Sequence, residues 1–383
     1  MKKRVYTFNL FTVIVVIGLL IFFVWVVYKG FTSDEFVETV QENVIGFFVD
    51  AGEDEEEKDT ISNSTSNGSS LVEVITSNTN TETSSGSNSI DVESADSDFF
   101  YNQLTDTQKI FYDGLLDSKE KMKTGTYTIE FGDVFSDILE QDNGSEELGD
   151  DYQAAIDAYI NDNPDIFYID VSKLYLNIET TKKTFSTKYN VYIAPQSGET
   201  YFADIFSSEE EVENAIEAVE EEKDFILSKL SGNDYDDIKT VHDYLITNIE
   251  YDQYYESADP YSLYGALIDK KAVCEGYAEA FKYLLNAAGM ECELIQGTAT
   301  NSEGTTENHE WNCVCIENTW YYIDVTWDDP VVVGGNIGLK DYNYQYFLKG
   351  TATFAEDHVE KYQFVDGGRE FYYPTISSTD YEI

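Results

Sequence analysis

Apolar residues recur at spacings of three and four along residues 278–288, which is the repeat of an amphipathic helix. The apolar positions are Ala278, Phe281, Leu284, Leu285 and Ala288. Gly289 follows them, where a left-handed residue would end a helix. The pattern therefore predicts a helix that begins at or near Cys274.

Downstream of this helix, the pattern changes to the short β-branched and aromatic runs of strands. It predicts a strand over 292–298 and a hairpin with strands over 311–316 and 320–327, joined by the turn Glu317-Asn318-Thr319. His309 would stand at the head of one hairpin strand and Asp324 on the other, as cross-strand neighbours. One face of the sheet would rest on the Cys274 helix, which gives an α+β core with an antiparallel sheet.

Two capping boxes predict helices earlier in the chain. Thr105 with Gln108 opens a helix to residue 122, and Ser208 with Glu211 opens one to residue 230. The other elements are a half-buried strand over Tyr127, Ile129 and Phe131, a helix over 150–160 stopped by Asn163-Pro164, short strands near Ile166, Leu174 and Tyr189, and a helix from Asp236. Residues 98–206 therefore form a small N-terminal α+β region.

The first 28 residues have the pattern of a membrane anchor. Residues 5–28 are uncharged and apolar, long enough to cross a bilayer, and no small-residue cleavage site follows. Lys2, Lys3 and Arg4 place residues 1–4 in the cytoplasm by the positive-inside rule, so the C-terminal domain is expected outside the cell. Residues 29–97 are acidic and rich in Ser, Asn and Thr, which predicts a disordered linker.

The formal net charge of −51 changes the choice of partners. It argues against nucleic acid and against close contact with an anionic membrane surface, because like charges repel. It favours a cationic partner, or serves only to keep the extracellular part in solution.

Cys274, His309 and Asp324 are the residue types of a cysteine acyl-transfer site. A thiol attacks a carbonyl effectively as thiolate, an imidazole can hold it in that form, and a carboxylate orients the imidazole. At a helix N-terminus, the free backbone N–H groups would favour the thiolate of Cys274 and a developing oxyanion. Gly276 would let a substrate backbone approach closely.

The surrounding motifs are Cys274-Glu275-Gly276-Tyr277, His309-Glu310-Trp311-Asn312 and Tyr321-Tyr322-Ile323-Asp324-Val325-Thr326-Trp327-Asp328-Asp329-Pro330. In this order, over about residues 241–358, the sequence resembles the transglutaminase-like superfamily. The resemblance implies a papain-like α+β fold for a domain over 207–383. It also implies Cys274 as nucleophile, His309 as base, Asp324 as orienting carboxylate, and Gly276, Tyr277 and Trp311 as substrate or oxyanion support.

These observations predict a membrane-anchored enzyme that transfers acyl groups from protein or peptide amides at the cell surface. Two alternatives stay open: a cysteine peptidase or amidase acting on cell-wall or surface peptides, and a non-catalytic binding or assembly protein with a degenerate site. We expect no cofactor, because three scattered histidines give no zinc site; bound Ca²⁺ stays an open alternative, although no calcium-binding motif is present. Cys292, Cys313 and Cys315 are expected to be buried free thiols. Five tyrosines before Cys274 are candidates for a cleft wall: Tyr251, Tyr254, Tyr255, Tyr261 and Tyr264.

Overall fold

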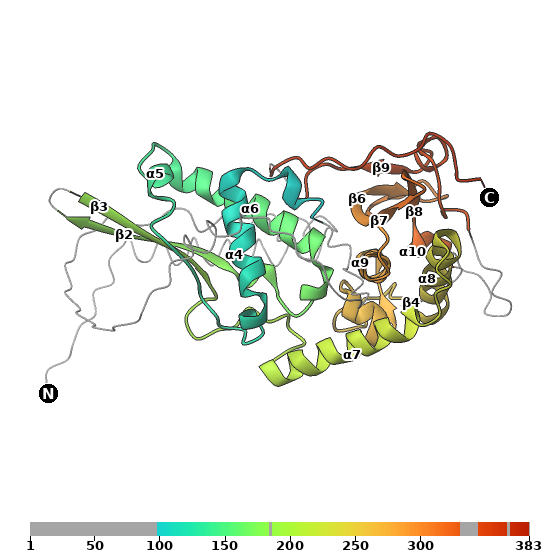
Figure 1. Cartoon of the computed structure of the whole chain (residues 1–383), viewed down its shortest axis with the longest axis horizontal. Helices are drawn as coiled ribbons and strands as arrows, with labels where there is room; N and C mark the ends of the chain where they lie inside the picture. Colours follow the sequence, from blue (N-terminus) through green and yellow to red (C-terminus); the bar gives the residue numbers. More distant parts are fainter. Residues whose placement is uncertain (1–97, 184–185, 330–343, 366–367, 383) are drawn as a thin grey trace, which may run out of the picture. The chain divides into compact units, whose positions relative to one another are not determined.

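Helix α9, Cys274–Ala287, packs against a four-stranded antiparallel sheet with the order β8-β7-β6-β9 (Figure 1). The strands are β6 Cys292–Thr300, β7 Thr306–Ile316, β8 Thr319–Ile323 and β9 His358–Glu360. The Asn312 side-chain amide of β7 donates to the Ala278 carbonyl of α9 at 3.0 Å, which joins the two layers. The predicted helix and its glycine end are confirmed, since Gly289 has a φ of 81°.

This computed structural model describes residues 98–183, 186–329, 344–365 and 368–382. The predicted anchor at 5–28 and the predicted linker at 29–97 lie outside the described residues. Within the described part of the chain, no helix has the length and apolar character needed to cross a bilayer.

The hairpin between β7 and β8 has a two-residue turn. Ile316 pairs with Thr319, and the turn residues Glu317 and Asn318 both have positive φ, of 52° and 59°, as the tightest hairpin turns require. The second predicted strand is wrong beyond Ile323. Asp324 instead caps the N-terminus of a short helix, α10 Val325–Asp328, by accepting from the Trp327 N–H at 3.0 Å.

Helices α7, Glu209–Leu227, and α8, Asp234–Asn248, precede the core. The Ser208 cap is confirmed, because its side chain accepts from the Glu211 N–H, although the Glu211 carboxylate turns back to Ser207 instead. Helix α7 ends three residues before the predicted limit. Helix α8 begins two residues before the predicted start, because Asn233 caps it.

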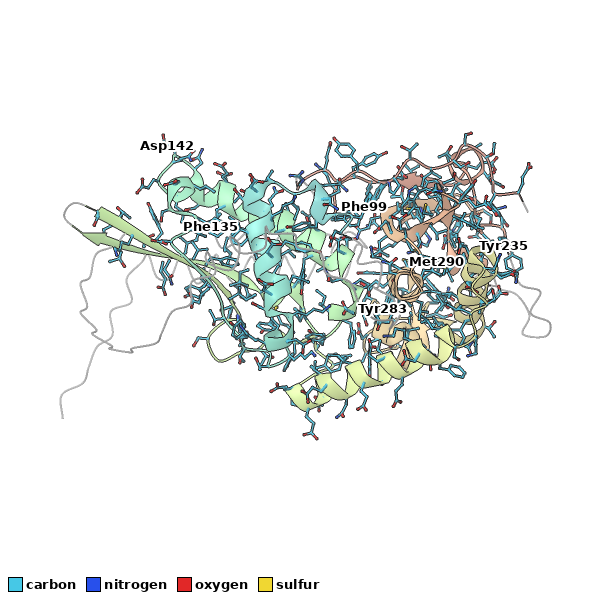
Figure 2. The ribbon with its side chains drawn as sticks, viewed as in Figure 1. Phe99, Phe135, Asp142, Tyr235, Tyr283 and Met290 are labelled. Carbon is cyan, nitrogen blue, oxygen red and sulfur yellow. The ribbon has the colours of Figure 1, made fainter. Side chains whose placement is uncertain are left out.

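The N-terminal region packs helices α4, Asp106–Met122, and α6, Gly144–Asp162, with a sheet of order β1-β3-β2. Its antiparallel strands are β1 Ile129–Gly132, β2 Tyr175–Lys183 and β3 Ser186–Ala194. Phe111 of α4 stacks on Phe135 with ring centroids 4.5 Å apart. Figure 2 shows where Phe135 lies in this region. The capping box of Thr105 is confirmed.

Two predictions for this region need correction. Helix α6 begins at Gly144, six residues before the predicted start, after Asn143 in the left-handed conformation. The strand near Ile166 is wrong, because residues Pro164–Ile166 form a 3₁₀ turn that follows the proline. The strands near Leu174 and Tyr189 are confirmed as β2 and β3.

Shorter elements complete the described chain. They are α5 Ser136–Leu139, α11 Thr351–Phe354, the parallel pair β4 Glu250–Tyr251 and β5 Lys271–Ala272, a π-helical turn Gly265–Asp269, and 3₁₀ turns at Tyr101–Gln103 and Val171–Lys173.

One apolar cluster contains residues of both the N-terminal region and the α9 core. The Phe100 ring lies 5.7 Å from the Phe371 ring, and the Lys282 ammonium of α9 lies 5.9 Å from the centre of Phe100. The Arg369 guanidinium donates to Gln108 and to the Gln103 carbonyl. Residues on both sides of the predicted boundary at 206 therefore share one core.

Candidate active site

Cys274 is the first residue of α9 and is partly exposed. The preceding residue, Val273, offers no side-chain cap to the helix. The thiol therefore lies where unpaired backbone N–H groups and the positive end of the helix dipole stabilise an anion. This matches the position that the apolar pattern predicts.

His309 lies between the thiol and a buried carboxylate. Its Nε2 is 2.7 Å from Asp324 Oδ2. The Cys274 side chain lies near enough to raise the pKa of His309, and Nδ1 is the ring nitrogen that Asp324 leaves available to the thiol. Burial alone would lower the pKa of His309, but Asp324 and then Cys274 raise it to about 10. The imidazole is therefore cationic at neutral pH and can stabilise a thiolate.

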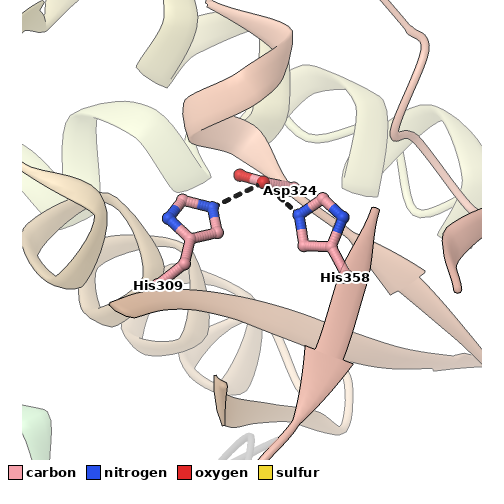
Figure 3. A group of neighbouring side chains, drawn as sticks. All are labelled: His309, Asp324 and His358. Atoms are coloured by element: carbon pink, nitrogen blue, oxygen red, sulfur yellow. Dashed lines mark hydrogen bonds and ion pairs between the residues drawn. The ribbon is translucent and has the colours of Figure 1, made fainter. Parts of the chain in front are cut away.

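Asp324 is fully buried, and both of its oxygens accept hydrogen bonds. Oδ1 accepts from the Trp327 N–H at 3.0 Å, while Oδ2 faces His309 at 2.7 Å and His358 at 3.1 Å (Figure 3). Burial would raise the pKa of this carboxyl, but the two histidines outweigh it and hold the pKa below its usual range. Asp324 is therefore an anion shared by two imidazoles.

The predicted cross-strand pairing of His309 with Asp324 is wrong, although the two side chains do meet. His309 lies inside β7, opposite Gly297 of β6, and Asp324 lies beyond the end of β8. Contact arises because the cap of α10 turns the carboxylate back over the sheet. Figure 3 shows the two rings approaching Asp324 from opposite sides.

His358 is a site residue that the sequence motifs do not mark. It lies on β9, is 4 % exposed, and its second nitrogen, Nδ1, is 2.6 Å from Asp357 Oδ1. The other Asp357 oxygen accepts from the Tyr346 hydroxyl at 2.7 Å. A lone histidine in a three-residue strand carries no spacing signal, so the pattern of the chain could not have located it.

The ligand-type atoms of His309, Asp324 and His358 lie within 4.8 Å of one another. Hydrogen bonds account for this grouping, because Asp324 accepts from both rings while the remaining ring nitrogens face Cys274 and Asp357. We therefore assign no metal to these residues.

The residues predicted to support substrate or oxyanion make contacts within the protein core. A Cβ on Gly276 would meet the carbonyl oxygens of Pro260 and Ser262 at 2.9 Å, so this glycine permits close packing of α9. Tyr277 is fully buried and donates to Asp329 at 2.7 Å. Trp311 is buried in an apolar cluster on the sheet. Gly276 and the side chains of Tyr277 and Trp311 therefore have structural contacts within the core, and their support of substrate or oxyanion stays a prediction.

A second group of acidic side chains lies near Cys274. Glu275 and Glu279 of α9 and Glu310 of β7 form this group, which we call the carboxyl cluster. Burial and neighbouring carboxylates raise the pKa of all three, that of Glu275 to about 7. Glu279 accepts from the Leu263 N–H at 2.9 Å, and Glu310 accepts from the Gln296 amide at 3.2 Å.

The tyrosines before Cys274 divide into two groups. Tyr254, Tyr255 and Tyr261 are exposed, and the last two stack with ring centroids 6.1 Å apart. Burial raises the pKa of Tyr261, and the charges of Tyr255, Glu275 and Cys274 add to this effect, so its phenol lies within electrostatic reach of the thiol. Tyr251 and Tyr264 instead pack against the core, with ring centroids 6.5 Å from Tyr277 and 5.4 Å from Phe167 respectively.

The four cysteines are free thiols. Cys292 and Cys313 are buried, as expected, while Cys315 is partly exposed. Cys292 pairs across the sheet with Val314, so its side chain lies on the face opposite to Cys313. No sulfur of these three takes part in the contacts of His309.

Comparison with known proteins agrees with the geometry of the α9 core. Residues 226–325 match the family model of the transglutaminase-like superfamily. The kyphoscoliosis peptidases of Mus musculus and Homo sapiens are 33 % identical over 98 residues and 34 % identical over 100 residues. Each match covers 23 % of this chain and 15 % of the relative, so the chain spans only a small part of those proteins.

A crystal structure of a TGase superposes on 46 % of this chain and 50 % of its own, with a TM-score of 0.28 and 17 % identity. The family match covers the segment that contains Cys274, His309 and Asp324. This chain therefore carries a transglutaminase-like domain, in which a cysteine-bearing helix packs on an antiparallel sheet.

Proposed function

We propose that this protein is a cysteine-dependent acyltransferase that acts on amides of proteins or peptides. The observation that carries the proposal is the series of contacts from the Cys274 thiol through the His309 imidazole to the Asp324 carboxylate. Nucleophile, proton carrier and orienting group stand in the order that covalent acyl transfer requires.

The mechanism follows from the order of these groups. The Cys274 thiolate attacks the amide carbonyl, and the oxyanion that forms is stabilised by the Cys274 N–H at the start of α9. The His309 imidazolium gives its proton to the leaving amine, so the carbon–nitrogen bond breaks and a thioester remains. An incoming amine or water then loses a proton to His309 as it attacks the thioester, which frees the thiolate.

We propose an amine ahead of water as the acceptor. The net charge of −51 concentrates lysine-bearing partners around the protein, and this favours transfer. Hydrolysis is the second candidate, because the relatives from mouse and human are named peptidases. A glutamine-bearing peptide with a labelled primary amine separates the two. Incorporated label supports transfer, whereas ammonia release or peptide cleavage without incorporated label supports hydrolysis.

Reactivity of Cys274 tests the catalytic proposal without knowledge of the substrate. At pH 6 an ordinary thiol, with a pKa of about 8.5, is mostly protonated and reacts slowly with iodoacetamide. We expect rapid alkylation of one thiol in the native protein and none of this fast phase in Cys274→Ala. Slow alkylation of the native protein would instead favour the alternative hypothesis of a non-catalytic binding protein.

The predicted topology belongs to this proposal as well. We propose that residues 5–28 anchor the chain, with the domain outside the cell, because three basic residues precede an uncharged apolar run. Protease added to intact cells should release a fragment that begins within the Ser-rich stretch of residues 62–89. A mature form that begins near residue 31 would instead indicate a cleaved signal, and a fully protected domain would place it inside the cell.

A further inference from the structure

We infer that His358 is a positioning residue of this site: it acts as an imidazolium that holds the Asp324 carboxylate from the side opposite His309. The inference rests on the proposed function, since it gives His358 a role only if Cys274 and His309 are the reacting pair. It does not make His358 a catalytic residue, because the side chain that contacts Cys274 is that of His309.

The two ring nitrogens of His358 both face carboxylates. Nε2 is 3.1 Å from Asp324 Oδ2, and Nδ1 is 2.6 Å from Asp357 Oδ1. A neutral imidazole has one N–H and one lone pair, so it could satisfy only one of these anions and would repel the other. Two hydrogen bonds to two carboxylates require both nitrogens to carry protons, and the ring is then a cation.

The surroundings fix this ring in place. Aromatic rings pack around it, with centroids 4.1 Å away for Phe354, 4.7 Å for Trp327 and 5.1 Å for Trp311. The titratable groups that face it are Asp324, Asp357, His309 and Tyr346. The Tyr346 hydroxyl holds Asp357 in turn, so His358 is anchored on the side away from Asp324.

His358 affects the reacting pair in two ways. It is one of three donors that fix the Asp324 carboxylate, with the Trp327 N–H and His309, and so it fixes the direction in which His309 is held. Its hydrogen bond to Oδ2 also offsets part of the charge on Asp324. His309 therefore binds its proton less tightly than it would beside an unshared carboxylate. A proton carrier must release as well as hold its proton, and the second effect favours release.

The chain contains a matched control. His242 is also fully buried between two carboxylates, with Nε2 3.1 Å from Asp328 Oδ2 and Nδ1 3.2 Å from Asp243 Oδ1. The bonds of its two ring nitrogens run to those carboxylates and not to Asp324. Replacing either histidine removes a buried cation from between two anions, but only His358 shares the carboxylate that holds His309.

The experiment measures the rate of Cys274 alkylation by iodoacetamide between pH 4 and 11 for the native protein, His358→Gln and His242→Gln. For His358→Gln we expect about a tenfold lower rate near neutral pH, as for loss of an outer partner that orients a reactive group. We also expect the upper inflection of the profile, where His309 loses its proton, to move to higher pH. His242→Gln should lower the melting temperature but leave rate and inflection unchanged.

Two outcomes overturn the inference: a native profile for His358→Gln, or the same altered profile for His242→Gln. An unreactive native protein would overturn the proposed function instead, so the two failures are distinguishable. If His358→Gln does not fold, Asp357→Ala replaces it, because this side chain is 26 % exposed and tolerates change. That variant removes the anchor of His358 and should lower the rate in the same direction, and a native rate would count against the inference.

Discussion

His309 and Glu310 are adjacent in sequence, yet their side chains project from opposite faces of β7 into opposite electrostatic surroundings. On the His309 side, imidazoles and carboxylates alternate in the order His309, Asp324, His358 and Asp357, and the Cys274 thiol lies beside His309. On the Glu310 side, the carboxyl cluster brings together groups of one sign. Cys274 lies within reach of both.

The comparison shows that burial alone does not set the charge of a side chain. Asp324 and Glu310 are both buried, but the pKa of Asp324 is lowered and that of Glu310 is raised. The partners decide: two imidazoles stabilise the Asp324 anion, whereas Glu275 and Glu279 disfavour a further charge on Glu310. Asp324 therefore stays an anion and His309 a cation at neutral pH, whereas the carboxyl cluster takes up protons.

The largest effect is expected when the imidazole of His309 is removed. His309→Ala should lower turnover of a glutamine peptide by about 10⁵-fold or more, because residues that act as one unit fail together. Glu310→Gln, one residue away on the opposite face, is the control and should have a far smaller effect. Equal losses in the two variants would show that the two faces do not differ in function.

The second variant is Asp324→Ala, which removes the shared anion. We expect a loss of about 10⁴-fold, the mildest in the triad, as when the orienting carboxylate is lost elsewhere. The sign of the pH effect follows from the cause. Asp324 raises the pKa of His309 to about 10. Without Asp324 this pKa falls toward 6.5, so the upper limb of the pH–rate profile should move to lower pH. A pH–rate profile checks this, and an unchanged upper limb would contradict the assignment.

The third prediction concerns stability and the carboxyl cluster. A carboxyl with a pKa raised in the folded state binds more protons there than when unfolded, so its stabilising effect is present at low pH and is lost as pH rises. The pKa of Glu275 is raised to about 7. Glu275→Gln should therefore stabilise the protein at pH 8 by on the order of 2 kcal/mol.

At pH 5 the same substitution should have little effect, because Glu275 is then protonated and resembles glutamine in charge. Urea unfolding at both pH values measures the difference. A gain at pH 5 as large as that at pH 8 would mean that the charge of Glu275 is not its cause.

The smallest expected effect is on binding at the exposed tyrosine pair. Tyr261→Ala should raise KM several-fold, equivalent to about 1 kcal/mol of lost aromatic contact, and leave kcat unchanged. The reason is the exposed, stacked position of Tyr261 within electrostatic reach of Glu275 and Cys274. Steady-state kinetics with a glutamine peptide check it, with the core residue Tyr264→Phe as control, and a fall in kcat alone would exclude a binding role.

The sequence pattern predicts those elements of the fold that depend on residues close together in the sequence. The Cys274 helix follows from its apolar repeat and the turn at Glu317 from its position between two strand-like runs. The aromatic run that continues to Trp327 predicts a strand through Asp324, but the preference of Asp for helix caps ends the strand at Ile323.

His358 and the carboxyl cluster could not be predicted in the same way. His358 reaches Asp324 only because β9 joins the free edge of β6, a pairing between residues about sixty positions apart. Glu275 and Glu279 are neighbours on any helix, but Glu310 joins them through the register of β7 against β6 and the packing of α9. These contacts depend on tertiary structure, which one sequence does not reveal.

The buried side chain of Lys282 links the folding of the α9 core to that of the N-terminal region. Its ammonium is fully buried, pairs with Glu293 of β6 and lies beneath Phe100 of the N-terminal region. Without the N-terminal region, the Lys282–Glu293 pair would be exposed to water. Helix α9 would also lose the contacts that it makes with that region. Folding of the helix that carries Cys274 is therefore coupled to residues more than 170 positions earlier in the chain. Residues 98–382 should melt in one transition, and the site should be lost with the core rather than before it.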